Sequence, residues 1–194
     1  EAFGPSLNPW AVEYGIKAEA DLFEILTRLG IPCPESRVEL LGCGHGTTLL
    51  NLTAAYSIFL NNGFRPSPGI VGSVTTSDGK PLWEKAPVFL HIASGIATKK
   101  VAVLLEDAVK SPRGTAHALD GLVGEPLLAK TGSSRSQKRL QILLPESGLS
   151  IGIHVLADSG DLPRAAETSA VNIAKDLVLR AAGTSKQSRV LTTR

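Results

Sequence analysis

The chain has 194 residues, with 20 Lys and Arg against 18 Asp and Glu, which gives a formal net charge of +2. Its 43% hydrophobic and 20% charged residues are typical of a globular protein and exclude a disordered, collagen-like or coiled-coil chain. No apolar run reaches the roughly 18 residues of a membrane span, and no long basic stripe indicates a nucleic-acid partner. Because the chain begins at Glu1 and contains no Met, we expect a trimmed chain or a fragment.

Two cysteines, Cys33 and Cys43, are the only thiols in the sequence. Neither they nor the four scattered histidines show a metal-ligand spacing. The cysteines therefore have two open interpretations. They are either two small apolar residues or a disulfide that closes a short loop in an oxidising compartment.

Helical periodicity dominates the first half of the chain. Residues 18–30 carry apolar side chains at helical spacing and end in a glycine, which predicts a helix with a glycine C-cap. A second helix is expected over 49–63, with Thr47 or Thr48 as its N-cap. A third helix is expected over 94–110, with five apolar residues facing the core: Ile96, Val101, Leu104, Leu105 and Ala108.

The remaining segments have the patterns of strands and one closing helix. Residues 69–87 contain two extended stretches around an Asp-Gly turn, which predicts a β-hairpin. An amphipathic helix is expected over 165–182, followed by a polar tail over 183–194. Three strands with short connections, favouring an antiparallel meander, are expected before that helix: 126–134, 139–146 and 149–157. The layout predicts an α+β fold, in which a helical subdomain precedes a short antiparallel sheet with a covering C-terminal helix.

The strand that follows the glycine-rich loop carries the first candidate site. Lys130-Thr131-Gly132 is followed by Ser133 and Ser134, so a cation stands beside several hydroxyl groups and small residues. A carboxylate ligand is bound best by such a combination of a charge and several hydrogen-bond donors. The alternative interpretation is a strand that simply ends in a turn.

Ser6-Leu7-Asn8 is the second candidate, placed just before a proline and the first helical region. A hydroxyl with an amide two residues later can serve as a proton relay and a substrate anchor. The alternative is a capping Ser or an Asx turn that leads into a helix.

The order of these two motifs, with Ser-x-Asn upstream of Lys-Thr-Gly, resembles the transpeptidase domain of penicillin-binding proteins, especially the bifunctional peptidoglycan synthases. The text between them is similar to the same family in three places: TTLLNLTAAYSIFLNNGFRPSPGIVGSV, TSDGKPLWE and LLEDAVKSPRGTAHALDGLVGEPLLAKTGSS. The resemblance covers residues 1–182, which are identified as the C-terminal portion of such a domain, and leaves the tail 183–194 outside it.

This resemblance implies acyl transfer. In the family, the serine of a Ser-x-x-Lys motif attacks the D-Ala-D-Ala amide of a stem peptide, releases D-Ala and passes the acyl group to an amine. The resemblance implies that Ser6 relays a proton to the leaving amine and that Asn8 binds the amide side of the peptide. It implies that Lys130 supplies positive potential to Ser6 and to the terminal carboxylate.

The resemblance also implies a substrate-binding strand. Thr131 and Ser133 would offer hydroxyls to the carboxylate, and the Ser133 N–H would form half of an oxyanion hole. Gly132 and Ser134 would complete the strand along which the ligand lies. β-Lactams would act as covalent mimics of the same ligand, and no metal or cofactor is implied.

Two departures from the family stand out. The only Ser-x-x-Lys string runs from Ser77 to Lys80 on the expected Asp-Gly turn. No helix holds the two side chains on one face there, so we interpret the string as part of the turn and not as the nucleophile motif. The nucleophile would then come from an upstream part of the same domain. The family's Asp-Ala-Trp-Phe-type stretch after the third motif is replaced by RSQKRLQILLPES, which has no aromatic residue.

These departures keep alternatives open. One is a non-catalytic penicillin-binding-like domain that binds a stem peptide or a partner protein, and another is an unrelated α+β domain. The cluster of Arg135, Lys138 and Arg139 is either a solvated strand edge or a contact for an anionic glycan. The resemblance implies a location outside the cytoplasmic membrane, with contact to the membrane only through an anchor in the parent protein.

Overall fold

The computed structural model describes residues 3–33, 36, 46–133, 137–156 and 170–182. Predictions that concern Cys43, Ser134, Arg135, the start of the closing helix and the polar tail lie outside these residues. The question of a disulfide between Cys33 and Cys43 therefore lies outside them as well.

Two short helices open the described chain, α1 (Asn8–Lys17) and α2 (Glu19–Leu29). The expected helix over 18–30 is confirmed, because α2 ends at Gly30, which has a left-handed φ of 64°. No bounds were predicted for the separate helix α1, although the alternative interpretation of Ser6-Leu7-Asn8 placed a helix start there. This helix buries none of its residues, so its formation does not depend on a core contact that an apolar pattern would indicate.

The second predicted helix is confirmed with a shorter span. α3 (Leu49–Tyr56) begins after Thr48, whose side chain accepts a hydrogen bond from the Asn51 N–H at 3.1 Å. The helix then tightens into the 3-10 turn η2 (Ser57–Phe59) and ends before Asn62 and Gly63, which both have positive φ.

Gly63 is a point where a side chain has no room. Its φ is 91°, and a Cβ atom built there would lie 1.8 Å from the carbonyl oxygen of Ala93. We expect Gly63→Ala to lower the free energy of unfolding by about 1–3 kcal/mol, because the backbone must shift to relieve the clash. Gly79→Ala is the matched control, since Gly79 has a φ of 85° and open space around it. Equal losses for the two variants in urea unfolding would contradict the prediction.

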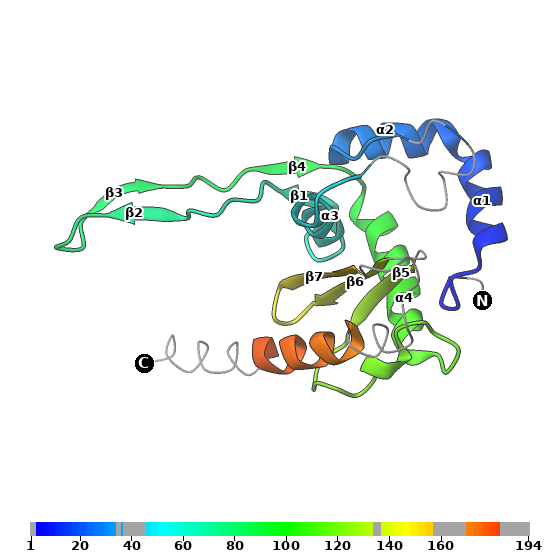
Figure 1. The fold of residues 1–194 in the computed structure, drawn as a ribbon. Helices are drawn as coiled ribbons and strands as arrows, with labels where there is room; N and C mark the ends of the chain where they lie inside the picture. Colours follow the sequence, from blue (N-terminus) through cyan, green and yellow to red (C-terminus); the bar gives the residue numbers. More distant parts are fainter. Residues whose placement is uncertain (1–2, 34–35, 37–45, 134–136, 157–169, 183–194) are drawn as a thin grey trace.

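A long arm leaves the body of the molecule after η2 (Figure 1). Its base is formed by β1 (Phe64–Pro66) paired with β4 (Phe89–His91), and its tip by β2 (Ser73–Thr75) paired with β3 (Pro81–Glu84), both antiparallel. The tip confirms the hairpin expected over 69–87. The pairing at the base was not predicted, because each strand has only three residues and the whole arm separates them in the sequence.

α4 (Gly95–Lys110) confirms the third predicted helix, with Ser94 as its N-cap. Leu105 and Ala108 are buried as expected, but Ile96 is 74% exposed and Leu104 is 39% exposed, so these two assignments to the core were wrong. The buried stripe of α4 runs through Thr98, Leu105, Ala108 and Val109. Leu105 of this stripe packs against the sheet, together with the partly buried Val101. An apolar pattern alone does not tell which side of a helix packs against a neighbouring element.

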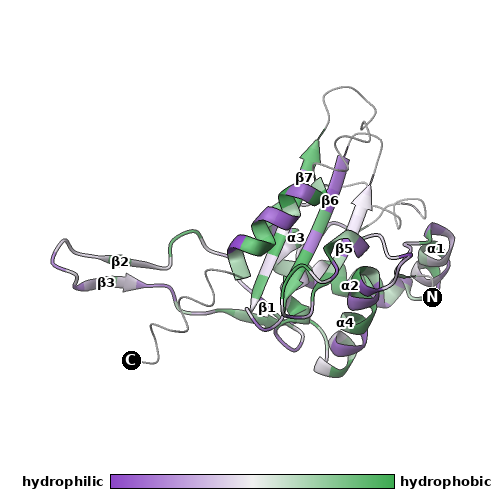
Figure 2. Ribbon diagram, turned by 90° about the horizontal axis from the view of Figure 1, so that it is seen from below, coloured by the Kyte–Doolittle hydropathy of each residue, from purple (hydrophilic) through white to green (hydrophobic). Residues whose placement is uncertain are grey.

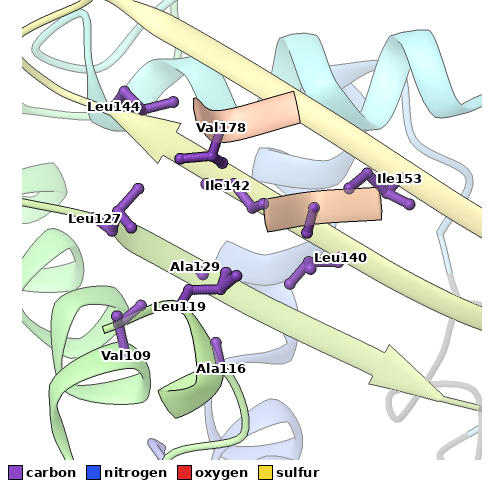
Figure 3. Close-up of a cluster of buried hydrophobic side chains, with 11 residues drawn as sticks. Val109, Ala116, Leu119, Leu127, Ala129, Leu140, Ile142, Leu144, Ile153 and Val178 are labelled. Atoms are coloured by element: carbon purple, nitrogen blue, oxygen red, sulfur yellow. The ribbon is translucent and has the colours of Figure 1, made fainter. Parts of the chain in front are cut away.

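The predicted meander is confirmed as a sheet of three antiparallel strands in the order β5-β6-β7: β5 (Leu128–Ser133), β6 (Gln137–Leu144) and β7 (Leu149–Leu156). The helix over residues 170–182 covers one face, where a cluster that includes Leu140, Ile142 and Val178 is buried (Figure 3). α4 packs on the opposite face through Leu105, against Leu128 and Leu143. β6 is hydrophilic where it begins and hydrophobic in its second half, between these layers (Figure 2). The α+β fold class is therefore confirmed.

Candidate active site

The structure brings the two candidate motifs together at β5. The ammonium group of Lys130 donates a hydrogen bond to the Ser6 hydroxyl at 2.7 Å, and a second to the carbonyl oxygen of Thr131 at 3.0 Å. The two side chains are 124 positions apart in the sequence. Their contact is therefore produced by the tertiary fold and not by local chain geometry.

Ser6 is held by a tight turn that is anchored on α4. Its N–H donates to the carbonyl of Phe3 at 3.0 Å, and its φ of 58° is left-handed, which costs a non-glycine residue about 1–3 kcal/mol. Gly4 is buried so closely that a Cβ there would lie 2.6 Å from the Asp107 carboxylate. The Thr115 N–H also donates to the Gly4 carbonyl, at 3.2 Å. These contacts fix the Ser6 hydroxyl beside Lys130.

Ser6 does not cap the helix that follows it. The N-cap of α1 is Leu7, and no side chain there accepts a capping hydrogen bond, so the capping alternative for Ser6 was wrong. Asn8 is exposed at the first position of α1. Its side chain is exposed to solvent two residues after Ser6, so a ligand can reach the amide group.

The side chain of Lys130 is partly buried. Burial lowers the pKa of Lys130 from its ordinary value of 10.5. The ammonium nitrogen also lies 5.8 Å from the centre of the Phe3 ring, in a cation–π contact. A cation with reduced hydration attracts an anion more strongly than one in bulk water, so this group is suited to hold a carboxylate or to polarise a hydroxyl.

The rest of the third motif continues along an open strand edge. β5 pairs with β6 on one side, and no described strand pairs with its other edge. The hydroxyl groups of Thr131 and Thr115 are joined by a hydrogen bond of 2.7 Å, while Gly132 and Ser133 are exposed. An extended ligand can add to such an edge through main-chain hydrogen bonds. The partner Thr115 was missed at the sequence level, because nothing local links a loop residue to the strand.

The Ser-x-x-Lys string lies elsewhere, as expected. Ser77 is in the turn between β2 and β3, where Lys80 pairs with Asp78 at 3.2 Å. This turn is at the end of the arm that points away from β5 (Figure 1). Its residues therefore do not reach the Ser6 hydroxyl.

A second polar group lies on β6 and β7, near the end of β5. Gln137 accepts a hydrogen bond from Arg139 at 3.0 Å, and its amide oxygen lies 3.2 Å from Nε2 of His154. Burial lowers the pKa of His154 below its ordinary value of 6.5, and the positive charge of Arg139 lowers it further.

The lowered pKa of His154 has a consequence for stability. The folded protein binds a proton at His154 less readily than the unfolded chain does, so acidification below about pH 6.5 favours unfolding. The contribution of His154 to stability should therefore be greatest above this pH and should be lost as the pH drops toward the folded-state pKa. His154→Gln should flatten this slope in urea unfolding between pH 7 and 5, whereas His91→Gln, at an exposed site, is the control. An unchanged slope in His154→Gln would contradict the prediction.

The described residues contain neither a metal-binding cluster nor a membrane-spanning helix. No group of three or more His, Cys, Asp or Glu gathers among them. None of their helices is both long enough and apolar enough to cross a bilayer.

Comparison with known families finds a match that begins after Ser6 and Asn8 and includes the third motif. Residues 17–141 match the model of the penicillin binding protein transpeptidase domain, a span that includes Lys130, Thr131 and Gly132. The chain belongs to this family. The comparison with curated proteins gave no match.

Solved structures show the same fold. Penicillin-binding protein A from Mycobacterium tuberculosis aligns with a TM-score of 0.73 at 18% identity, over 93% of this chain and 50% of its own. Penicillin-binding protein 3 of the same organism, in complex with aztreonam, gives 0.71 at 21% identity, over 92% and 50%. Penicillin-binding protein 1A from Haemophilus influenzae gives 0.71 at 19% identity, over 82% and 30%. The chain thus spans half or less of these proteins.

Proposed function

We propose that this chain is the substrate-binding portion of a D,D-transpeptidase that cross-links peptidoglycan stem peptides. The observation that carries the proposal is the 2.7 Å hydrogen bond from Lys130 to Ser6, made at the open edge of β5. A hydroxyl held against a partly buried ammonium, next to an unpaired strand edge, combines a proton relay with a docking edge for an extended peptide.

The reaction divides between this chain and the rest of the domain. The nucleophilic serine of a Ser-x-x-Lys motif belongs to a part of the domain outside these 194 residues, since the only such string here lies on the arm. That serine attacks the carbonyl carbon of the D-Ala-D-Ala amide, the C–N bond breaks, and D-Ala leaves with a proton delivered through the Ser6 hydroxyl. An amine of a second strand then takes the acyl group from the serine.

The remaining residues of the site hold the ligand. Lys130 supplies positive potential to the Ser6 hydroxyl and to the terminal carboxylate, and Asn8 binds an amide of the peptide. The hydroxyls of Thr131 and Ser133 donate to the carboxylate, beside Gly132 on β5. Ser134, which lies outside the described residues, belongs to the same proposed binding segment of the sequence. The Ser133 N–H stabilises the oxyanion that forms during attack.

β-Lactams are the expected covalent inhibitors. The penicillin-binding protein 3 of similar fold was solved with aztreonam and with ampicillin, and penicillin-binding protein A as an imipenem acyl-enzyme complex. A β-lactam presents a reactive amide and a carboxylate in the arrangement that the site residues would hold. The domain would work on the outer face of the cytoplasmic membrane, where peptidoglycan is assembled, and would need no metal or cofactor.

The test uses the whole domain, with the segment outside these residues included. Incubation with fluorescent penicillin, followed by intact mass measurement and peptide mapping, should show one covalent adduct on a serine outside this chain. Heat-denatured protein is the control. An adduct on Ser77 would contradict the assigned roles, and saturable binding without an adduct would indicate the non-catalytic binding domain instead.

A further inference from the structure

The loop between α4 and β5 carries a residue that contacts both candidate motifs. The Thr115 N–H donates to the carbonyl of Gly4 at 3.2 Å, within the turn that leads to Ser6. The Thr115 hydroxyl accepts a hydrogen bond of 2.7 Å from the hydroxyl of Thr131, the residue after Lys130. Thr115 therefore joins the turn that carries Ser6 to the strand that carries Lys130.

The end of α4 fixes the position of Thr115. The N–H of the next residue, Ala116, donates to the carbonyl of Ala108 in the last turn of the helix, at 3.0 Å. On the other side of Thr115, a Cβ atom built on Gly114 would lie 2.2 Å from the same carbonyl oxygen. The loop thus lies so close to α4 that only a glycine fits at position 114, and both neighbours of Thr115 are held against the helix.

The turn that carries Ser6 rests on the same part of α4. A Cβ atom built on Gly4 would lie 2.6 Å from the carboxylate of Asp107, so the turn and the helix are in close contact. The next residue of the helix, Ala108, is the one that holds the loop. The turn and the loop therefore share one support, whereas the third motif lies on a separate element, β5.

Side-chain contacts of two kinds join this support to the third motif. The Lys130 ammonium group makes the first kind, through its hydrogen bond to Ser6 and its cation–π contact with Phe3. A lysine carries its charge on a flexible four-carbon stem, so these contacts define the spacing of the two elements only loosely. The second kind is the hydrogen bond between Thr115 and Thr131. It joins two short β-branched side chains with few rotamers, so it restricts the spacing more tightly.

The spacing of the turn and the strand matters because proton transfer depends on distance. A relay works only when its atoms are within hydrogen-bond reach, and a displacement of about 1 Å can slow a reaction on the order of 100-fold. In the proposed function, Ser6 delivers a proton while Lys130 stabilises its hydroxyl. A contact that fixes the spacing without using either of these groups leaves both of them free for the reaction.

We propose that Thr115 is a positioning residue for acyl transfer, which sets the distance between the Ser6 hydroxyl and the Lys130 ammonium group through its hydrogen bonds to Gly4 and Thr131. The inference rests on the proposed function. Thr115 acts through Ser6 and does not itself move the proton. A hydroxyl at this position accepts the hydrogen bond from Thr131, so serine can replace threonine here, whereas valine has the same shape and cannot accept it.

The test measures acylation of the whole domain by fluorescent penicillin over a range of penicillin concentrations. Thr115→Val should lower the first-order rate constant of acylation about 3- to 10-fold, the effect of one neutral hydrogen bond. The apparent dissociation constant of the first complex should stay within about twofold, because the variant removes no group from the proposed ligand contacts. Thr115→Ser should recover most of the rate constant. Thr75→Val makes the same exchange at an exposed position of β2 and should have no effect.

A second measurement repeats Thr115→Val in a Ser6→Ala domain. The valine should now cost less than about twofold, because the hydroxyl that it misplaces is gone. An undiminished loss in this background, a loss confined to the dissociation constant, or an unchanged rate constant in Thr115→Val would each overturn the proposal. Partial unfolding lowers the fraction of the domain that reacts and leaves the rate constant of the folded fraction unchanged, so the two effects are separable. A wild-type domain that forms no adduct would instead contradict the proposed function.

Discussion

Replacing Lys130 by Ala should slow acylation of the whole domain by penicillin about 100- to 1,000-fold, the usual cost of removing one group that stabilises charge in the transition state. The variant loses the 2.7 Å hydrogen bond to the Ser6 hydroxyl and the only cation in contact with that hydroxyl among the described residues. Stopped-flow measurement with a fluorescent penicillin gives the rate. Lys99→Ala, on the exposed side of α4, removes the same charge and should leave the rate within about twofold.

A double-mutant cycle shows whether Lys130 acts through Ser6. If the hydroxyl relays a proton under the influence of the ammonium group, Ser6→Ala alone should cost about 100- to 10,000-fold. The double variant should then be little slower than the slower single variant, because residues that act as a unit are not additive. Fully multiplicative losses would show that the two side chains work independently, contrary to the contact in the structure.

Ile142→Ala should lower the free energy of unfolding by about 2–5 kcal/mol, the range for removing a large aliphatic side chain from a closed core. Ile142 has no exposed surface. It lies on β6, the central strand, on the face that the helix over 170–182 covers (Figure 3). Neighbours on both sides limit how far the cavity can collapse. Urea unfolding followed by circular dichroism measures the loss.

Ile70→Ala is the control for this prediction, because the same atoms are removed from a side chain that is 97% exposed. It should change the free energy of unfolding by about 0.5 kcal/mol or less. A loss in Ile142→Ala no greater than that in Ile70→Ala would show that the face of β6 toward the C-terminal helix is not a closed core.

Local sequence signals predicted the elements that depend on local hydrogen bonds. Gly30 ends α2 in a left-handed conformation, Thr48 and Ser94 cap α3 and α4, and Gly79 lies in the turn of the arm, as their residue types indicate. Each of these features is decided within about four residues of the chain. The meander was predicted for the same reason, since its strands are joined by short connections.

Features that depend on distant neighbours were missed or assigned wrongly. β1 and β4 pair across the whole arm, and α1 forms without burying any side chain. Ile96 and Leu104 have the spacing of core residues, yet they are exposed because the sheet packs against another side of α4. Periodicity shows that a helix has an apolar face, but the position of neighbouring elements decides how much of that face is covered.

The sequence by itself determined the residue types of the site, through the order of Ser-x-Asn and Lys-Thr-Gly and the family that this order resembles. Only the tertiary structure decided that the Ser6 hydroxyl contacts the Lys130 ammonium group and that Thr115 contacts Thr131. The physical reason is the range of the interactions. Caps and turns are closed by neighbours in the chain, whereas a site built from a turn, a loop and a strand exists only after folding has brought them within hydrogen-bonding distance.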